Sequence, residues 1–402
     1  MTSKFLIATA SASFLFGASA MAADPPKALK ITHSIGVALT DAQKAIGIKD
    51  YPAALAALEK AKAVSGPTPY DTLMINRFAM GIHVGMNDLA AADVDAEAAA
   101  DTDPSQIPDA DKAAVYKPAL QLAVNAKHTD KAMKYAKLFL ATTPPPTGQD
   151  LALASMAIFN GGDLATATSL AQKNIDAATA AGQKPSISDL QIIMNAQVKQ
   201  NDQAGAQKTM EQLVANYDQP QDWNTILSVS MTTRGMRELD YVYLGRLMLQ
   251  QGREISATDA QLIGTTANKM ALYGDAEALQ KVGGPPADAR EVADKKSIPA
   301  QIAAGAKQNG EYNVKLAEAL YGYGMFPEAI TAAQLAKTKG GASDPAEADM
   351  VIGMTQAATG KYAEAAATFS GIQLANPASA RVVRLWGYFV KSKASPATAA
   401  AK

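Results

Sequence analysis

The 402-residue chain contains no cysteine. Disulfide bonds and thiolate metal sites are therefore excluded, and so is a lipid anchor on an N-terminal cysteine. Histidine is scarce as well: His33, His83 and His128 are far apart, each without a carboxylate or second histidine at a spacing typical of metal ligands. We interpret them as solvated or packed imidazoles, and we expect neither a metal ion nor an organic cofactor.

An excess of charge of one sign is also missing, because 37 basic residues face 38 acidic ones and the formal net charge is −1. A near-neutral chain lacks the basic surface that nucleic acids and anionic membranes attract, so neither is an expected partner. After the first 22 residues, no stretch approaches the roughly 18 uninterrupted apolar residues of a membrane-spanning helix. No integral membrane span is therefore expected in the exported chain.

Motifs that carry catalytic chemistry are lacking. The segment 353–362 partly resembles a phosphate-binding loop. However, Gly353 and Gly360 are too far apart, and Tyr362 stands where that loop has the hydroxyl residue that binds magnesium. The acidic run 93–97 mimics the start of a calcium loop, but Ala98 replaces the turn glycine, so we interpret the run as a solvated helix face. Neither a G-x-S-x-G nor an H-E-x-x-H motif occurs.

A repeat is present instead. Short polar or aromatic turns followed by an alanine recur at intervals of roughly 35 to 40 residues, as expected for helix–turn–helix repeats. The turn alanines are Ala54, Ala92, Ala132, Ala167, Ala206, Ala278, Ala329 and Ala365. The double interval between Ala206 and Ala278 predicts a weakly marked unit at 241–249. Because a unit of this length cannot bury its own apolar face, the pattern predicts an all-α fold, an α-solenoid of about eight to nine stacked repeats.

The last unit carries the clearest signature. Gly353 precedes Ala365 by about three helical turns, Phe369 follows it by one turn, and Pro377 follows three turns later. This spacing resembles the tetratricopeptide (TPR) repeat: glycine lets two helices approach closely, the aromatic ring fills the groove between them, and proline stops the second helix. Pro104 and Pro144 occupy the same register and predict further helix stops.

The region 216–244 and the segment Arg384-Leu385-Trp386 resemble a group of uncharacterised exported TPR proteins of Proteobacteria. That resemblance implies fold and location, and it implies no reaction. Trp223, Tyr241 and Tyr243 form the densest aromatic cluster of this region, and we interpret them as packing for an irregular unit.

The two ends and one internal break divide the chain. Residues 1–22 resemble a secretory signal peptide, with Lys4, an apolar stretch and the cleavage motif Ala20-Met21-Ala22. We therefore expect a periplasmic protein, with full secretion as an open alternative. The remaining predicted parts are an N-terminal TPR-like array at 23–282, a hinge or insertion at 283–299, C-terminal TPR-like repeats at 300–391 and a disordered tail at 392–402.

The concave face of such an array is lined by the first helix of each repeat and is the expected binding surface. Counting from the turn alanines places these residues in the groove: Arg77, Phe159, Asn160, Gln191, Asn195, Lys199, Glu318 and Tyr321. Amides and cations in a groove suit an extended peptide or a terminal carboxylate.

These observations favour a non-catalytic scaffold that binds a protein or peptide segment of the bacterial cell envelope. Two alternatives stay open. One is an enzyme, or an enzyme accessory, that acts on envelope polysaccharide or peptidoglycan, which paired carboxylates in a pocket would support. The other is a small-ligand receptor, which a deep apolar pocket would support.

Overall fold

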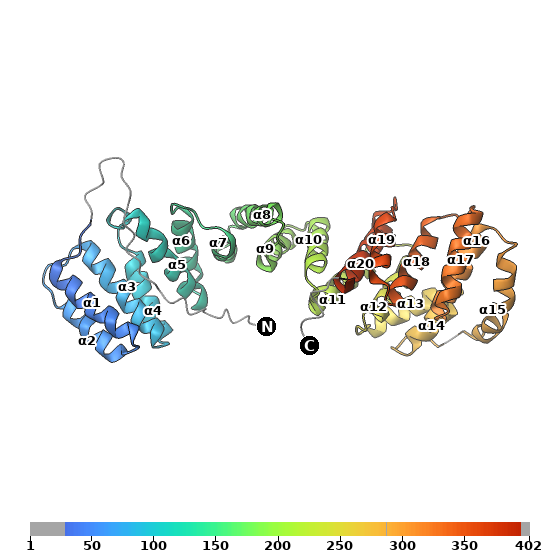
Figure 1. Ribbon diagram of the computed structural model, residues 1–402, viewed down its shortest axis with the longest axis horizontal. Coiled ribbons are helices and arrows are strands. Elements are labelled where there is room, and N and C mark those ends of the chain that lie inside the picture. The colour runs from blue at the N-terminus through green and yellow to red at the C-terminus, as the bar shows by residue number, and fades with distance from the viewer. Residues whose placement is uncertain (1–28, 287, 395–402) are drawn as a thin grey trace. The chain divides into compact units, whose positions relative to one another are not determined.

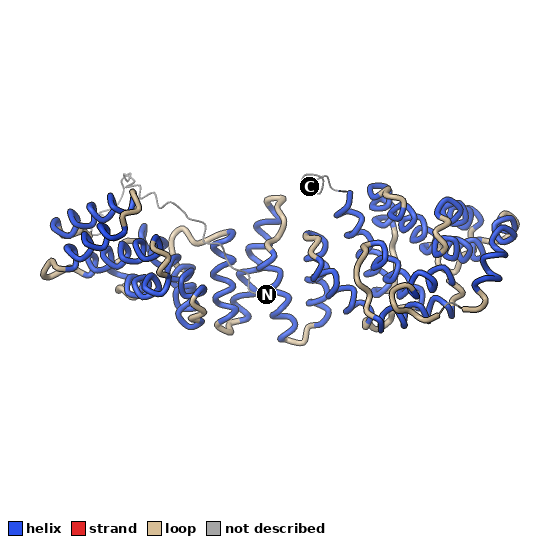
Figure 2. The backbone as a smooth tube through the Cα atoms, turned by 90° about the horizontal axis from the view of Figure 1, so that it is seen from below, coloured by secondary structure: helices blue, strands red, loops and turns tan. Residues whose placement is uncertain are grey.

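The computed structural model describes residues 29–286 and 288–394, and within them it is helical without a β-strand (Figures 1 and 2). The predicted signal peptide, 1–22, lies outside the described residues. The chain divides into two compact units, and the boundary falls between Pro146 and Thr147. The predicted fold class, an α-solenoid of consecutively packed helix pairs, is confirmed.

The first unit contains three helix pairs, α1/α2, α3/α4 and α5/α6. Its elements are α1 (His33–Gly47), α2 (Tyr51–Lys62), α3 (Pro69–Gly85), α4 (Leu89–Ala100), the short 3₁₀ helix η1 (Pro104–Gln106), α5 (Asp109–Asn125) and α6 (Thr129–Leu140). Ile35, Leu58 and Ile82 belong to a core shared by α1, α2 and α3, so the first pair buries its apolar face against the second.

The second unit begins with the regular pairs α7/α8 and α9/α10 and ends with a more compact assembly. Its helices are α7 (Gly148–Asn160), α8 (Leu164–Ala180), α9 (Ile187–Lys199), α10 (Gln203–Asn216), α11 (Pro220–Met231), α12 (Glu238–Gln250), α13 (Ala257–Lys269), α14 (Tyr273–Gln280), α15 (Glu291–Gly305), α16 (Gly310–Gly322), α17 (Phe326–Lys339), α18 (Ala346–Ala358), α19 (Tyr362–Gly371) and α20 (Pro377–Ala394).

One turn geometry joins the two helices in eight pairs of the described chain. The central residue of each turn has a left-handed conformation, with φ between 59° and 90°. These residues are Lys49, Asn87, Lys127, Gly162, Asn201, Ala271, Gly324 and Gly360. The amide of the next residue then donates back across the helix end, as from Asp50 to the Ala45 carbonyl at 2.9 Å, which is the bond expected of a Schellman motif.

Seven of the eight turn alanines, all except Ala278, follow these left-handed residues by five positions and are buried. Ala54, Ala92, Ala167, Ala329 and Ala365 have essentially no exposed surface. A methyl group at this position lets the second helix lie against the first with little separation.

The assignment of Ala278 to this register was wrong. The left-handed residue of its turn is Ala271, and the buried alanine in register is Ala276, whereas Ala278 is half-buried. Ala271 gives no sequence signal for a left-handed turn, because alanine adopts that conformation at a cost.

The predicted close approach in the last repeat is confirmed. A Cβ atom added to Gly353 would lie 2.8 Å from Cζ of Phe369, so only glycine fits there without movement of the ring. Phe369 in turn stacks on Trp386 of α20, with ring centroids 5.7 Å apart. Pro377, however, does not stop a helix: α19 ends at Gly371, and Pro377 is the first residue of α20, a position that suits proline because its missing N–H would be unpaired there.

From α12 onward the second unit closes on itself. Helices α12, α14, α16, α18 and α20 each contact the next, and α20 also contacts α12, so these five form a closed ring (Figure 1). Helix α20 reaches α10 as well, and Trp386 donates a hydrogen bond to the Tyr243 carbonyl at 3.1 Å. The predicted weakly marked unit at 241–249 corresponds to α12, which belongs to the ring and not to a regular pair.

The segment 283–299 lies inside the second unit, and its later part forms the start of α15. Pro299 lies within that helix. Helix α15 contacts α16 and α17, and the Asp294 carboxylate accepts a hydrogen bond from Tyr323 at 2.8 Å. The beginning of the predicted tail, residues 392–394, completes α20, and 395–402 lie outside the described residues.

Candidate functional site

The centre of the ring contains a buried ionic cluster around Arg246 of α12. Its guanidinium donates two hydrogen bonds of 2.8 Å to Asp275 of α14 and also bonds the carboxylate of Glu318 of α16. The Tyr243 hydroxyl donates to Glu318 at 2.5 Å, and the guanidinium lies 4.4 Å from the ring centroid of Tyr321. Burial acts to lower the Arg246 pKa, but Asp275 and Glu318 outweigh it and hold that pKa well above its ordinary value.

A second network at the edge of this centre connects α12 to α18 and α20. Arg237 forms ion pairs with Asp240 at 3.0 Å, Asp344 at 2.7 Å and Glu347 at 3.3 Å. Ser379 of α20 donates to Asp240 at 2.7 Å. Burial, reinforced by the negative charge of Glu318, raises the pKa of Glu347 to about 7, because one guanidinium shared among three carboxylates does not compensate for the lost hydration.

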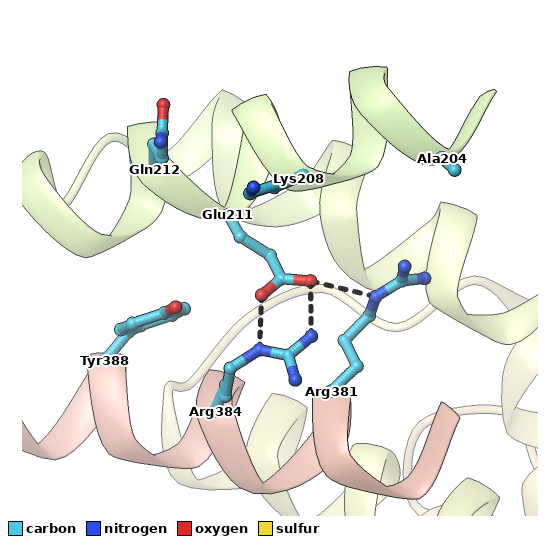
Figure 3. A pocket seen from close by; sticks show the side chains of 7 residues that line it. All are labelled: Ala204, Lys208, Glu211, Gln212, Arg381, Arg384 and Tyr388. Atoms are coloured by element: carbon cyan, nitrogen blue, oxygen red, sulfur yellow. Dashed lines mark hydrogen bonds and ion pairs between the residues drawn. The ribbon is translucent and has the colours of Figure 1, made fainter. Parts of the chain in front are cut away.

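An open cleft of about 410 Å³ lies between α10 and α20 (Figure 3). Glu211 of α10 points into it and accepts hydrogen bonds from Arg384 Nε at 2.6 Å, Arg384 Nη2 at 2.9 Å and Arg381 Nε at 3.0 Å. The remaining lining residues are Ala204, Lys208, Gln212 and Tyr388. The hydrogen bonds to Glu211 raise the pKa of Arg384, and burial raises that of Tyr388.

Positive charge exceeds negative charge in the α10/α20 cleft. Lys208, Arg381 and Arg384 carry three positive charges, and Glu211 carries the one negative charge among the lining residues. Lys208 is exposed and forms no ion pair within the described residues, while the Arg384 side chain is 45% exposed. The cleft therefore presents cationic donors to solvent in a protein that is otherwise near neutral.

A second cleft of about 590 Å³ lies between α14, α15 and the turn that joins α16 to α17. Of its two lining lysines, Lys295 lies 2.7 Å from Glu277 and 2.7 Å from Glu291, and Lys281 is exposed. The bond from Lys295 lowers the pKa of Glu277. Because Glu277 and Glu291 compensate Lys295, this cleft keeps less excess positive charge than the first and attracts an anionic ligand less strongly.

The predicted groove residues belong to both units, and two of them are buried. Arg77 belongs to the first unit and lies 3.6 Å from Asp111. In the second unit, Lys199 lies over the ring of Phe159, 4.6 Å from its centroid. Nearby on the same two helices, Asn160 and Asn195 are exposed and Gln191 is half-buried.

Glu318 and Tyr321 were expected to line an open groove, but they are only 3% and 7% exposed. Both lie inside the closed ring, where Glu318 bonds Arg246 and Tyr243, and the ring of Tyr321 lies against the Arg246 guanidinium.

Sequence reasoning missed the α10/α20 cleft. Arg381, Arg384 and Tyr388 recur at the spacing of one helix face, which is a detectable signal for a polar stripe. Their partner Glu211 lies 173 residues before Arg384, and no local pattern predicts that contact.

The acidic run 93–97 contacts two histidines and a lysine from other parts of the first unit. His83 lies 2.6 Å from Asp95, His128 lies 3.0 Å from Asp93, and Lys131 donates to Glu97 at 2.6 Å. Over 29–286 and 288–394, no group of three or more candidate ligands is arranged to hold a metal ion.

No family model matches this chain, and no curated protein matches it. The class of protein is thus defined by the structure, as a helical-repeat protein whose second unit ends in a closed ring. None of its described helices combines the length and apolar character that crossing a membrane requires.

Proposed function

We propose that this protein is a non-catalytic scaffold of the bacterial cell envelope that binds a segment of another protein. The tetratricopeptide-like spacing of its repeats supports this function, because stacked helix pairs commonly present extended surfaces for protein recognition. The signal-like sequence at 1–22 supports export, with the periplasm as the proposed location.

The main support for the proposal is the position of the carboxylates. Asp275 and Glu318 come together, but both are buried and bonded to Arg246. The two clefts described above contain one lining carboxylate each, Glu211 and Glu277, and both bind cations of the same chain. Polysaccharide hydrolysis uses two carboxylates that flank an accessible bond, so these clefts suit recognition better than that reaction.

The α10/α20 cleft is broad, open and charged, whereas a receptor for a small apolar ligand encloses most of its ligand. Its exposed lysine and arginine suit a partner that brings its own charged side chains to a protein surface.

Crosslinking in the cells that produce the protein tests this proposal. The tagged full-length protein is crosslinked through lysines in the intact envelope, purified, and analysed by mass spectrometry for partners and linked positions. We expect one dominant envelope protein, linked to lysines on the open faces of the helix pairs. Recovery of the protein alone would contradict the scaffold function and favour the enzyme or receptor alternative.

A further inference from the structure

We propose that the cleft between α10 and α20 binds an acidic segment of the partner protein, with Lys208 and Arg384 contacting its carboxylates. This inference rests on the proposed scaffold function and specifies its partner. The cleft combines an excess of positive charge, exposed donors and a size suited to a few side chains.

The chain itself shows how a carboxylate fits this cleft. Glu211 lies against Arg384 with two hydrogen bonds, one from Nε and one from Nη2, in the parallel geometry that guanidinium and carboxylate groups favour (Figure 3). Arg381, one turn earlier on α20, adds a third bond to the oxygen that Arg384 Nη2 also contacts. Glu211 is buried and neutralises one of the three cations, so the cleft keeps an uncompensated charge of about two units for a ligand.

The donors left for a partner lie on both helices. Lys208 of α10 carries an ammonium group that forms no ion pair within the described chain, and it is exposed. Arg384 of α20 keeps nearly half of its side chain in contact with solvent. The Tyr388 hydroxyl also lines the cleft. An acidic segment that lies along the cleft would thus meet cations from two sides.

The surroundings favour a protein segment over a long polyanion. Asp218, beyond the end of α10, lies 3.1 Å from Lys393 of α20 and 3.7 Å from Arg253, so these two cations are already paired. The lining of the cleft itself supplies three cations. Nucleic acids and sulfated polysaccharides gain affinity from many cations spread over a long surface, whereas two or three carboxylates fit a cleft of about 410 Å³.

Fluorescence anisotropy of a labelled peptide tests the inference. The probe is a twelve-residue peptide of alternating glutamate and alanine, titrated with the purified full-length protein at low salt, and a glutamine-for-glutamate peptide is the neutral comparison. We expect binding of the glutamate peptide alone, and weaker binding as salt is added.

Charge reversal then locates the site. Lys208→Glu is the main variant, because Lys208 supports no ion pair of the fold, and it should weaken binding by roughly tenfold. Lys173→Glu on α8 is the matched control: Lys173 is also an exposed helical lysine without an ion pair among the described residues, and this variant should bind like the unmodified protein. Arg384→Gln should weaken binding too, with circular dichroism confirming that the helices remain.

Three results would overturn the inference: equal binding by the Lys208→Glu variant, an equal loss with Lys173→Glu, or tighter binding of a dextran sulfate fragment than of the peptide.

Failure of this inference can be distinguished from failure of the scaffold function. If Lys208→Glu retains the crosslinked partner in cells, the cleft is the wrong site and the scaffold stands. If the unmodified protein captures no partner, the scaffold function itself fails.

Discussion

Arg246 and Glu318 form an ion pair at the centre of the ring, although 72 residues separate them in the sequence. The guanidinium bonds both the Glu318 carboxylate and the Glu318 main-chain carbonyl, the latter at 2.9 Å. Arg246 thereby ties α12 to α16, and through Asp275 it ties α12 to α14 as well. This pair fixes the inner helices around a polar centre where an open solenoid would have a groove.

Replacing Arg246 by methionine should destabilise the second unit by about 3 to 5 kcal/mol, because two buried carboxylates lose their partner. Both tryptophans, Trp223 and Trp386, lie in the core of this unit, so tryptophan fluorescence during urea unfolding reports the change. The control is Arg290→Met, which removes a solvent-exposed pair with Asp288 and should leave the urea midpoint nearly unchanged, because water and salt screen such pairs. An Arg246→Met variant that unfolds at the same urea concentration as the unmodified protein would disprove a structural role for the cluster.

Glu347 should make the stability of the second unit depend on pH. Its pKa rises from an ordinary value of 4.5 to about 7 in the folded protein, so folding favours its protonated form. Burial of the charged Glu347 side chain lowers the free energy of unfolding. This loss is absent below about pH 4.5, and it grows with pH until the pH exceeds 7. Its side chain is 24% exposed.

Glu347→Gln should therefore gain stability relative to the unmodified protein as pH rises from 4.5 to 8, by up to about 3 kcal/mol. Urea unfolding at several pH values measures this difference, and Glu364→Gln, a change of an exposed glutamate on α19, is the control. A difference that stays constant across this pH range would show that Glu347 ionises normally.

Gly353 should be intolerant of alanine. The added methyl group would meet the ring of Phe369, which is held against Trp386, and we expect a loss of about 1 to 3 kcal/mol. Gly371 of the same helix pair has open space around its Cα, so Gly371→Ala should leave stability unchanged or raise it by up to about 1 kcal/mol. Equal effects of the two substitutions on urea unfolding would contradict the close approach of α18 and α19.

The left-handed turns predict that two substitutions change stability in opposite directions. Ala271 has a φ of 59°, so Ala271→Gly should raise stability by about 1 kcal/mol. Gly360 has a φ of 78°, so Gly360→Ala should lower it by a similar amount. Thermal unfolding of the two variants, followed by tryptophan fluorescence, checks both signs, and a shift in the same direction for both would disagree with the turn geometry.

The repeat could be predicted because its signals are local. A small residue such as Ala54 or Ala365 must follow each turn wherever two helices pack closely, and Gly324 and Gly360 mark left-handed turns in the sequence itself. The predicted register was wrong at Ala278. The left-handed residue of that turn is Ala271, so neither a glycine nor a polar residue marks the turn in the sequence.

The candidate site could not be predicted, because it depends on contacts between distant segments. Register predicted Glu318 and Tyr321 in an open groove, but both are buried inside the ring, which α20 closes by contacting α12. The cleft needs Glu211 of α10 to meet Arg381 and Arg384 of α20. Such a contact depends on the accumulated curvature of every intervening repeat, which degenerate repeats do not specify.

The most direct test of the central claim places a photoreactive amino acid at Gln212, an exposed residue that lines the α10/α20 cleft, and irradiates living cells. A second variant carries the same amino acid at Lys173, away from the cleft. The account predicts one dominant adduct with an envelope protein from position 212 and none from position 173. Irradiated protein that stays free of adducts at position 212, and that also comes out alone after lysine crosslinking, would contradict a scaffold function.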